Sequence, residues 1–214
     1  MSTSDPRQFL TDTFPALFAK GVEELRAKAA AGDAAAKMRL ADVEGASGGV
    51  LLRVEGEGDV FLVLEEGGRM KTADAAENVR LAIAAPGPAL RTLLGEAEAS
   101  GELADAQAGH RAVGTASKAL QDALGDESLL FHVIAEGVPE LGTVTVKIGL
   151  NATEPPETPT FTATMAFDDL EAARNGQTNA QELFMGGKLK MAGDYSRALQ
   201  IGMQVLQLQS QMQG

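Results

Sequence analysis

Histidine and cysteine, two side chains that often carry catalysis or bind metals, are scarce in this sequence. It has two histidines and no cysteine, which removes thiolate nucleophiles and sulfur-ligated zinc. His132 lies in the apolar run 130–134, where alternation along a strand would place it opposite Phe131 and Val133. A lone histidine on a strand is more often a hydrogen-bonded surface residue than a general base. His110 lies in a stretch with few apolar residues, and we expect neither histidine to be catalytic.

Two other features have the residue types of an active site but are better explained by backbone structure. Asp168 and Asp169 could serve as acid and base, but they begin a helical pattern, where carboxylates stabilise the helix start. Gly56 and Gly58 lie between two strand-like runs, so they indicate a hairpin turn and not a dinucleotide site. The sequence has no His-Glu-x-x-His or phosphate-loop motif. We therefore predict a protein that is not an enzyme and that has no metal or cofactor.

Lysines and flexible apolar residues alternate near the C-terminus, and two interpretations of them stay open. Phe184 and Met185 precede a short strand-like run, in which Leu189 and Met191 alternate with Lys188 and Lys190. Thioethers and phenyl rings adapt to acyl chains of varied shape, but the same residues are common in ordinary cores. The lysines could meet a carboxylate or phosphate headgroup, or form the solvated face of a strand.

Composition and charge limit the class of protein further. The chain has 214 residues, 44% of them hydrophobic, which is enough for a sizeable core. Its formal net charge of −12 opposes binding to nucleic acid and strong adsorption to anionic membranes. No run approaches the roughly 18 apolar residues of a membrane span, and the first residues do not resemble a secretion signal. We predict a cytoplasmic protein without nucleic-acid partners or stable membrane insertion.

The apolar pattern predicts alternating helices and strands. In the first half, a helix begins near residue 12 and ends near 29, runs 50–54 and 60–64 form a hairpin, and 79–84 form a strand before a short helix at 89–94. A helix at 116–124 ends at Gly125. In the second half, strands are expected at 129–135, 144–150, 161–167 and 188–192, with helices beginning at Asp168, at Asn179 and after Asp194.

The two halves resemble each other, which favours an internal repeat. Residues 184–200 align with 105–121 and match at Gly193 and Gly114 and at Ser196 and Ser117. We expect both segments to be a strand, a glycine and a helix. Further upstream, 38–45 resembles 131–137 and 79–84 resembles 161–166. These matches predict two related units, 1–126 and 127–214.

The last helix has an unusually wide apolar surface. At about 100° per residue, its glutamines share one narrow stripe, while apolar residues occupy the rest of the circumference. The glutamines are Gln200, Gln204, Gln207 and Gln211. The apolar arc is about twice the roughly 100° of an ordinary surface helix. The helix must therefore bury two faces, one on its own sheet and one against a cavity, a ligand or another subunit.

Several motifs in the C-terminal part of the chain form one pattern. A strand ends at the acidic helix start 165–169, and the Asn175-Gly176 pair and residues 179–181 follow it. The block Phe184-Met185-x-Gly187-Lys188-Leu189-Lys190-x-x-Gly193-Asp194 is the most specific part. This pattern, over residues 129–214, resembles the sterol carrier protein family, also called non-specific lipid-transfer proteins. The first half shares it only through the internal repeat.

This resemblance implies a fold and a function. The fold is α/β (α+β): a mostly antiparallel sheet covered by helices, here in two tandem units. The function is intracellular binding or transfer of a lipid, such as a fatty acid, acyl-CoA, sterol or phospholipid, in an apolar tunnel. We expect residues 127–214 to form the lipid-binding unit and 1–126 to be a degenerate copy that serves as scaffold or lid. The residues expected to line the tunnel are Phe161, Met165, Phe184, Met185, Leu189, Met191, Leu199, Met203 and Leu206.

Two other classes of function stay open at this point. The fold could have lost its ligand and act as an interaction or dimerisation module through the last helix, which would make the protein a homodimer. It could also be an accessory or catalytic subunit acting on a hydrophobic substrate, for which Tyr195, His132 and Asp194 are the candidate residues.

Overall fold

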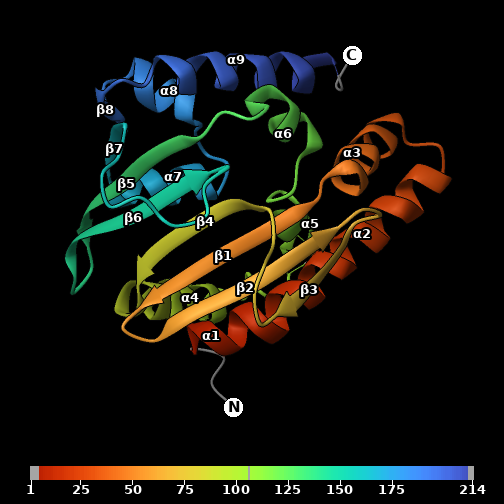
Figure 1. Cartoon of the computed structure of the whole chain (residues 1–214), viewed down its shortest axis with the longest axis horizontal. Helices are drawn as coiled ribbons and strands as arrows, with labels where there is room; N and C mark the ends of the chain where they lie inside the picture. The colour runs from red at the N-terminus through yellow and green to blue at the C-terminus, as the bar shows by residue number, and fades with distance from the viewer. Residues whose placement is uncertain (1–4, 106, 212–214) are drawn as a thin grey trace.

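A single sheet runs through the whole molecule (Figure 1). The computed structural model describes residues 5–105 and 107–211, with side chains as far as residue 204. Strands lie in the order β3-β2-β1-β4-β6-β5-β7-β8, and only the pairs β1–β4 and β5–β7 are parallel. Their bounds are β1 Gly48–Glu55, β2 Gly58–Glu65, β3 Arg69–Ala73, β4 Val79–Pro86, β5 Leu129–Val138, β6 Gly142–Leu150, β7 Phe161–Ala166 and β8 Lys190–Gly193. The predicted mostly antiparallel sheet is confirmed.

The helices gather mainly on one face of this sheet. They are α1 Pro6–Gln8, the π-helix η1 Phe9–Thr13, α2 Phe14–Ala30, α3 Ala34–Gly45, α4 Gly87–Ala99, α5 Ala108–Val113, α6 Lys118–Leu124, α7 Phe167–Arg174, α8 Ala180–Met185 and α9 Ser196–Gln211. Strand register places Leu64, Ala135 and Leu150 on the same face, because directly paired residues point to one side. Leu64 packs with α2, α3 and α5, Ala135 with α4 and α7, and Leu150 with α6 and α9. We call this face the helix-covered face and the other the open face.

Most of the elements predicted from the sequence are present. The helix expected near 12–29 is α2, and the hairpin of β1 and β2 turns at Gly56 and Gly58, which both have positive φ. These glycines shape a turn, as predicted, because L side chains rarely adopt that conformation. Ser117 and Asn179 cap α6 and α8, each accepting a hydrogen bond from a backbone N–H three residues on.

One sequence match has no structural counterpart, and one local prediction was wrong. Residues 38–45, which resemble 131–137 in sequence, lie in α3, whereas 131–137 lie in β5. The wrong prediction is the strand before Gly114. The residues before Gly114 form α5, whereas those before Gly193 form β8. Short, alanine-rich segments have little periodicity to separate helix from strand, so packing decides. Strand β3 was not predicted, because residues 69–73 carry few of the apolar residues that mark a strand.

The two halves follow one topological pattern. In the first half, β1 pairs with β2 in antiparallel and with β4 in parallel orientation, and α4 follows β4 directly. In the second half, β5 pairs in the same way with β6 and β7, and α7 follows β7. The matched segments 79–84 and 161–166 fall in β4 and β7, which occupy corresponding places. A division into two units at residue 126 stays a prediction, since one sheet joins both halves.

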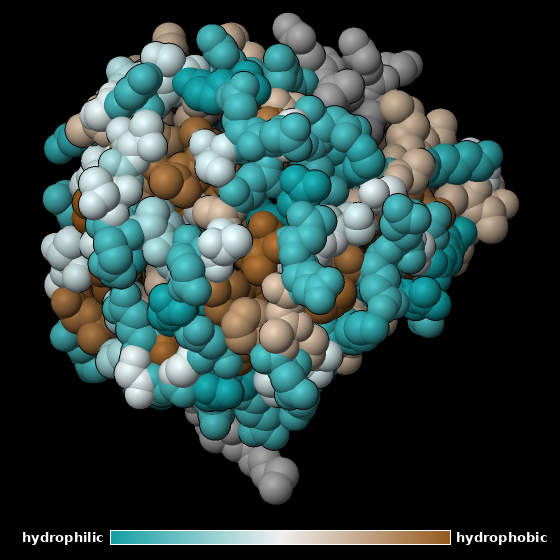
Figure 2. All heavy atoms as spheres, viewed as in Figure 1, coloured by the Kyte–Doolittle hydropathy of each residue, from teal (hydrophilic) through white to brown (hydrophobic). Residues whose placement is uncertain are grey.

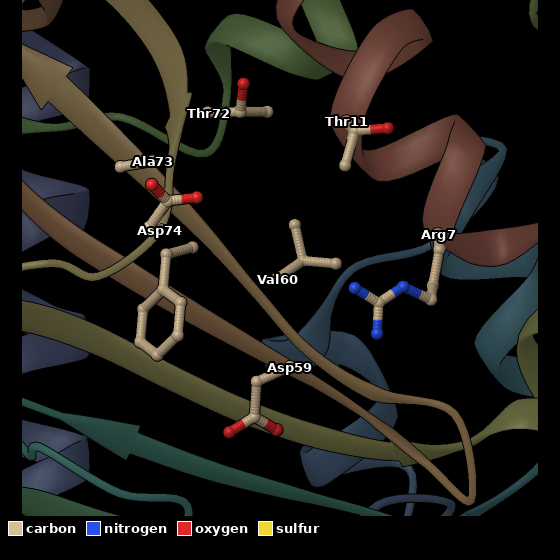
Figure 3. A pocket seen from close by; sticks show the side chains of 8 residues that line it. Arg7, Thr11, Asp59, Val60, Thr72, Ala73 and Asp74 are labelled. Carbon is tan, nitrogen blue, oxygen red and sulfur yellow. The ribbon is translucent and has the colours of Figure 1, made fainter.

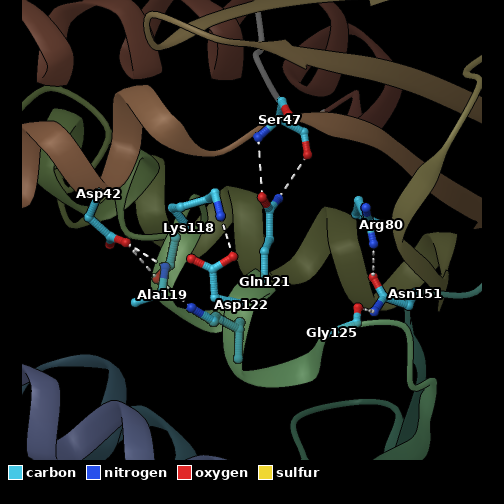
Figure 4. A network of polar contacts seen from close by, with 11 residues as sticks. Asp42, Ser47, Arg80, Lys118, Ala119, Gln121, Asp122, Gly125 and Asn151 are labelled. Atoms are coloured by element: carbon cyan, nitrogen blue, oxygen red, sulfur yellow. Dashed lines mark hydrogen bonds and ion pairs between the residues drawn. The ribbon is translucent and has the colours of Figure 1, made fainter.

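A polar network holds the junction of the two halves (Figure 4). Asn151, which follows β6, accepts a hydrogen bond from Arg80 of β4 at 3.1 Å. Its side-chain amide donates to the carbonyl oxygens of Gly125 and Glu127, at 2.9 and 3.0 Å. The side chain of Gln121 in α6 bonds the backbone of Ser47 in both directions. These contacts fix α6 and the start of β5 relative to both halves of the sheet.

The open face carries charged groups and a proline-containing segment. Arg53 donates to Asp59 at 2.8 and 2.9 Å and to Glu154 at 2.7 Å. Lys147 donates to Glu157 at 2.8 Å, and this hydrogen bond holds the pKa of Glu157 below its ordinary value. Figure 2, which views this side, shows apolar patches between polar side chains. Residues 151–160 are thereby tied across the open face, which explains why that face needs no helices.

The close crossing of α2 and α5 gives a first prediction. A Cβ on Gly21 would lie 2.3 Å from the carbonyl oxygen of Gly109. We expect Gly21→Ala to reduce the free energy of unfolding by about 1–3 kcal/mol, the usual range for overpacking. Gly95→Ala in α4 is the matched control, because nothing lies within 4 Å of its Cβ, and it should stabilise by roughly 0.5–1 kcal/mol. Urea denaturation measures both, and equal effects would contradict the crossing.

Asp59 gives a prediction about acid stability. Its hydrogen bonds from Arg53 hold the pKa of the Asp59 carboxyl below its ordinary value. Such a group stabilises the fold above its unfolded pKa of about 3.9, and the stabilisation is lost as pH falls through the folded pKa. We expect the difference in melting temperature between the wild type and Asp59→Asn to be constant above about pH 5 and to shrink below about pH 4. A difference that does not change with pH would contradict this.

Candidate functional site

Four of the nine residues expected to bind ligand lie together at the β7–β8 edge of the sheet. Register pairs Met191 of β8 with Ala163 of β7, so Met191 shares the helix-covered face with Phe161 and Met165. Phe161 is buried, and its ring stacks on that of Phe131 with centroids 5.0 Å apart. Met165 and Met191 are half-buried, as is Leu189, which immediately precedes β8. These four residues form an inner group.

Four others lie on the outside of α8 and α9. Phe184 is 37% exposed, Met185 78%, Leu199 40% and Met203 58%. Leu199 and Met203 follow Tyr195 at four-residue intervals, which places the three on one stripe of α9. The ring of Phe184 meets that of Tyr195 edge-on at 6.5 Å. These four form an outer group, and Leu206 lies in the part of α9 whose side chains the structure does not describe.

Helix α9 therefore presents two apolar faces, as its sequence predicts. Its inner face packs Ala198 and Ile201 into the cluster with α6, β5 and β7. The stripe with Leu199 and Met203 is exposed and, within the described residues, has Phe184 and Tyr195 beside it. Figure 1 shows α8 and α9 together along one edge of the molecule, on the side away from α1 and α2.

Between two groups of helices, the sheet carries a strip of half-buried apolar residues. Helices α6 and α9 pack against Leu129 and Phe131, near the beginning of β5, whereas α7 packs with Ala135 further along. Ile148 is paired with Phe131, and Val133 lies between Phe131 and Ala135 on the same face. Register extends the row to Ile83 in β4 and Leu52 in β1. We define these four half-buried residues, Leu52, Ile83, Val133 and Ile148, as the mid-sheet strip.

A cavity of about 220 Å³ lies at the end of β7, beside the inner group. Met165 lines it together with Lys188, Lys190 and Asp169. Lys188 donates to Asp169 at 2.7 Å, and Lys190 is exposed. Glu136 lines the cavity as well. Met165 thus lies beside a cavity lined by two lysines and two acidic residues, of which Lys188 and Asp169 are paired with each other.

A larger cavity lies elsewhere. It has a volume of about 500 Å³ beside β2 and β3 and is lined by Arg7, Asp59 and Asp74, among others (Figure 3). Its volume is typical of ligand sites, but its many polar groups do not suit an apolar lipid. We therefore place the candidate site at the inner group and the mid-sheet strip.

The residues considered for catalysis do not come together. His132 is on the open face, with Nε2 2.8 Å from the carbonyl oxygen of Pro156. Tyr195 packs into the cluster on the helix-covered face, so the sheet separates the two. Asp194 accepts a hydrogen bond from the backbone N–H of Ser196 at 3.2 Å, in a helix-start role.

Neither a Gly-x-Ser-x-Gly motif nor a ligand role for the mid-sheet strip was identified from the sequence. Residues 45–49 fit Gly-x-Ser-x-Gly, but Ser47 follows helix α3 and enters strand β1, the reverse of the strand-to-helix elbow that exposes a hydrolase nucleophile. Leu52 and Ile83 were assigned to strands without a ligand role. Alternation could have placed them on one face, but not in the interval between two helix groups.

These features define a helix-covered α+β protein with a candidate apolar site in its second half. Residues 111–206 match the sequence model of the SCP-2 sterol transfer family. The predicted resemblance is confirmed over that segment, which contains α6, the inner group and all the described residues of the outer group. The match supports lipid binding or transfer as the class of function.

Two solved structures show distant similarity. Sterol carrier protein 2 from Yarrowia lipolytica, in its apo form, is 20% identical over 38% of this chain and 66% of its own, just under two thirds, with a TM-score of 0.27. The sterol carrier protein domain 2 of Helicoverpa armigera is 18% identical over 58% of this chain and 87% of its own, with a TM-score of 0.30. No curated protein matches the sequence. Within the described residues, no helix is long and apolar enough to cross a membrane.

The two faces of α9 give a prediction about stability. Ile201 is 4% exposed, so Ile201→Ala should leave a cavity and cost about 2–5 kcal/mol of unfolding free energy. Leu199→Ala, two residues away on the exposed stripe, should change it by no more than about 0.5 kcal/mol. Chemical denaturation of both variants tests this. A large loss for Leu199→Ala would mean that the outer stripe is buried in solution, for example in a dimer.

Proposed function

We propose that this chain binds a lipid, such as a fatty acid, acyl-CoA or sterol-like molecule, against the helix-covered face of its second half. The observation that carries the proposal is the interval between the two helix groups, where Ile148 and Val133 remain half-buried. Apolar surface that the chain itself leaves partly accessible favours an apolar occupant. The sterol-transfer match over residues 111–206 supports the same class of ligand.

In this proposal the inner group forms one wall of an apolar tunnel. Phe161 supplies a rigid end where it stacks on Phe131, while Met165 and Met191 adapt to the shape of the chain. Lys188 or Lys190 would meet an anionic headgroup at the cavity beside Met165. Asp169 already pairs with Lys188, which leaves Lys190 for that contact. Lys190 is paired with Thr164, so it would have to reach the headgroup around the β8 edge of the sheet from the open face. The outer group, including Leu206, would lie at the entrance or on the membrane-facing side during transfer.

We also propose that the halves are tandem units, 1–126 and 127–214, of which the second binds lipid and the first is a degenerate copy. The repeated strand order and the corresponding places of β4 and β7 support this. The apolar residues Phe184 and Met185 of the second unit align with Asp105 and a small residue in the first. The first unit would then serve as scaffold, lending Leu52 and Ile83 to the strip.

The alternative is a ligand-free interaction module that forms a homodimer through α9. The exposed stripe of Leu199 and Met203 would supply the contact. The sterol-transfer match favours lipid binding, so we keep the interaction module as an outcome of the test below. A cytoplasmic location also stays a prediction.

The test compares one substitution on the two faces of the sheet. Ile148→Thr in β6 places a hydroxyl on the strip, whereas Ile134→Thr in β5 makes the same change on the open face. Both isoleucines are half-buried, so their effects on folding should be similar. With the fluorescent fatty acid cis-parinaric acid as probe, we expect Ile148→Thr to weaken binding about tenfold, or about 1.4 kcal/mol. Ile134→Thr should bind like the wild type.

In parallel, native mass spectrometry of the purified protein detects a bound ligand, and solvent extraction followed by lipid analysis identifies its class. Equal affinities for all three proteins would contradict the proposed site. No uptake of fatty acid, acyl-CoA or sterol by the wild type, together with a concentration-dependent dimer, would replace lipid binding with the interaction module.

A further inference from the structure

The first half contains an apolar pocket that the proposed lipid site does not use. It has a volume of about 180 Å³ and lies where η1 and the start of α2 face α5. Its apolar lining consists of Phe9, Phe14, Leu17, Leu103, Ala108 and Ala112. Large side chains from one wall therefore face two alanines on the other, and the space between them is not filled.

The crossing of α2 and α5 explains why this space exists. The two helices touch at Gly21 and Gly109, where a Cβ on Gly109 would lie 2.9 Å from the Cα of Gly21. Straight helices in contact at one point diverge away from it. Leu17 and Phe14 lie one and two turns before Gly21, where the gap is opposite Ala108 and Ala112. The pocket is a consequence of backbone geometry and does not need a ligand to hold it open.

The π-helical turn brings a second aromatic ring to the same wall. In an α-helix, residues five apart point roughly 140° away from each other at about 100° per residue. In η1 the N–H of Phe14 bonds the carbonyl of Phe9, an i to i+5 contact, so the two residues come to one side. Their ring centroids are 6.4 Å apart. Single π-turns are rare in proteins as a whole, but those that occur are often found at functional sites.

The polar groups at the rim of the pocket already have partners. Arg111 donates to Asp105 at 2.9 Å and also bonds the carbonyl oxygen of Glu102. The Glu102 carboxylate accepts from Arg174 of α7 at 3.3 Å. A charged ligand would have to displace these contacts, whereas an uncharged hydrocarbon group would not. The lining and the rim thus select the same class of ligand.

We propose that this pocket is a second binding site, for an uncharged hydrocarbon group of roughly six carbon atoms. An enclosed apolar cavity of about 150 Å³ has room for benzene, and this pocket, which is open to solvent on one side, has a volume of the same order. The ligand is either a small apolar molecule or the end of a longer chain. The site is distinct from the strip and the inner group and does not depend on them.

The absence of tryptophan from the chain permits a local test. Phe9→Trp places a single fluorophore in the pocket wall, and the probe is 1-bromohexane, whose bromine quenches indole on contact. We expect saturable quenching of Trp emission. Adding Ala108→Leu to fill the pocket should weaken the apparent affinity at least tenfold. Adding Leu103→Ala to enlarge it should improve binding of 1-bromooctane relative to 1-bromohexane.

A second reporter separates this site from the proposed lipid site. Phe184→Trp monitors the second half of the chain. Quenching in the Phe9→Trp protein supports the pocket even if cis-parinaric acid fails to bind. Quenching confined to the Phe184→Trp protein, or quenching of Phe9→Trp that Ala108→Leu leaves unchanged, would overturn the proposal.

Methyl NMR of the wild type tests the same pocket without any substitution, so a disturbed fold cannot produce the result. Toluene should shift the methyl signals of Leu17, Leu103, Ala108 and Ala112 and leave those of Leu199 unchanged. If toluene does not shift the pocket methyls, the site does not exist in solution.

Discussion

The pairing of β4 with β6 is the contact on which the rest of the structure depends. Four residue pairs join the halves here, from Leu81 with Leu150 to Ala84 with Lys147. Ala82 is fully buried, and a Cβ on its partner Gly149 would lie 2.8 Å from the Cβ of Ala152. Small residues are thus required where the chain leaving β6 crosses the sheet. Without this pairing each half would expose a strand edge, an aggregation hazard in solution.

One consequence is that the candidate site is built by both halves. The row Leu52, Ile83, Ile148 and Phe131 crosses the β4–β6 junction in register. The family match begins at residue 111, so it includes the β6 side of this row and not the β4 side. A C-terminal fragment that lacks β4 would lose half of the strip as well as a neighbour for β6. Scaffold and site are therefore difficult to separate in this chain.

A second consequence is that different interactions dominate on the two faces of the sheet. Helices bury apolar side chains on one face, while hydrogen-bonded ion pairs and residues 151–160 cover much of the other. Exposed ion pairs contribute little individually, so apolar packing provides most of the stability. It includes the helix-covered face and also Leu51 and Ala82 on the open face, which are 1% and 0% exposed. The strip and the hydrocarbon pocket both lie where that packing is incomplete. They occur because helices that cross at an angle cannot cover a sheet evenly.

The sequence by itself determined the elements with strong periodicity and the resemblance of the second half to a sterol-transfer family. Two apolar, β-branched runs at 50–54 and 60–64, separated by turn-forming residues, predicted the β1–β2 hairpin. The wide apolar arc around Leu199 and Ile201 predicted two apolar faces on α9. Helix α3 and strand β3 were missed, since alanine-rich or charged segments take their conformation from neighbours. Only the tertiary structure decided that Phe161 and Met191 point inward while Met185 and Met203 point outward. The reason is that periodicity gives the direction of a side chain relative to its own element, whereas its burial depends on which other elements lie opposite.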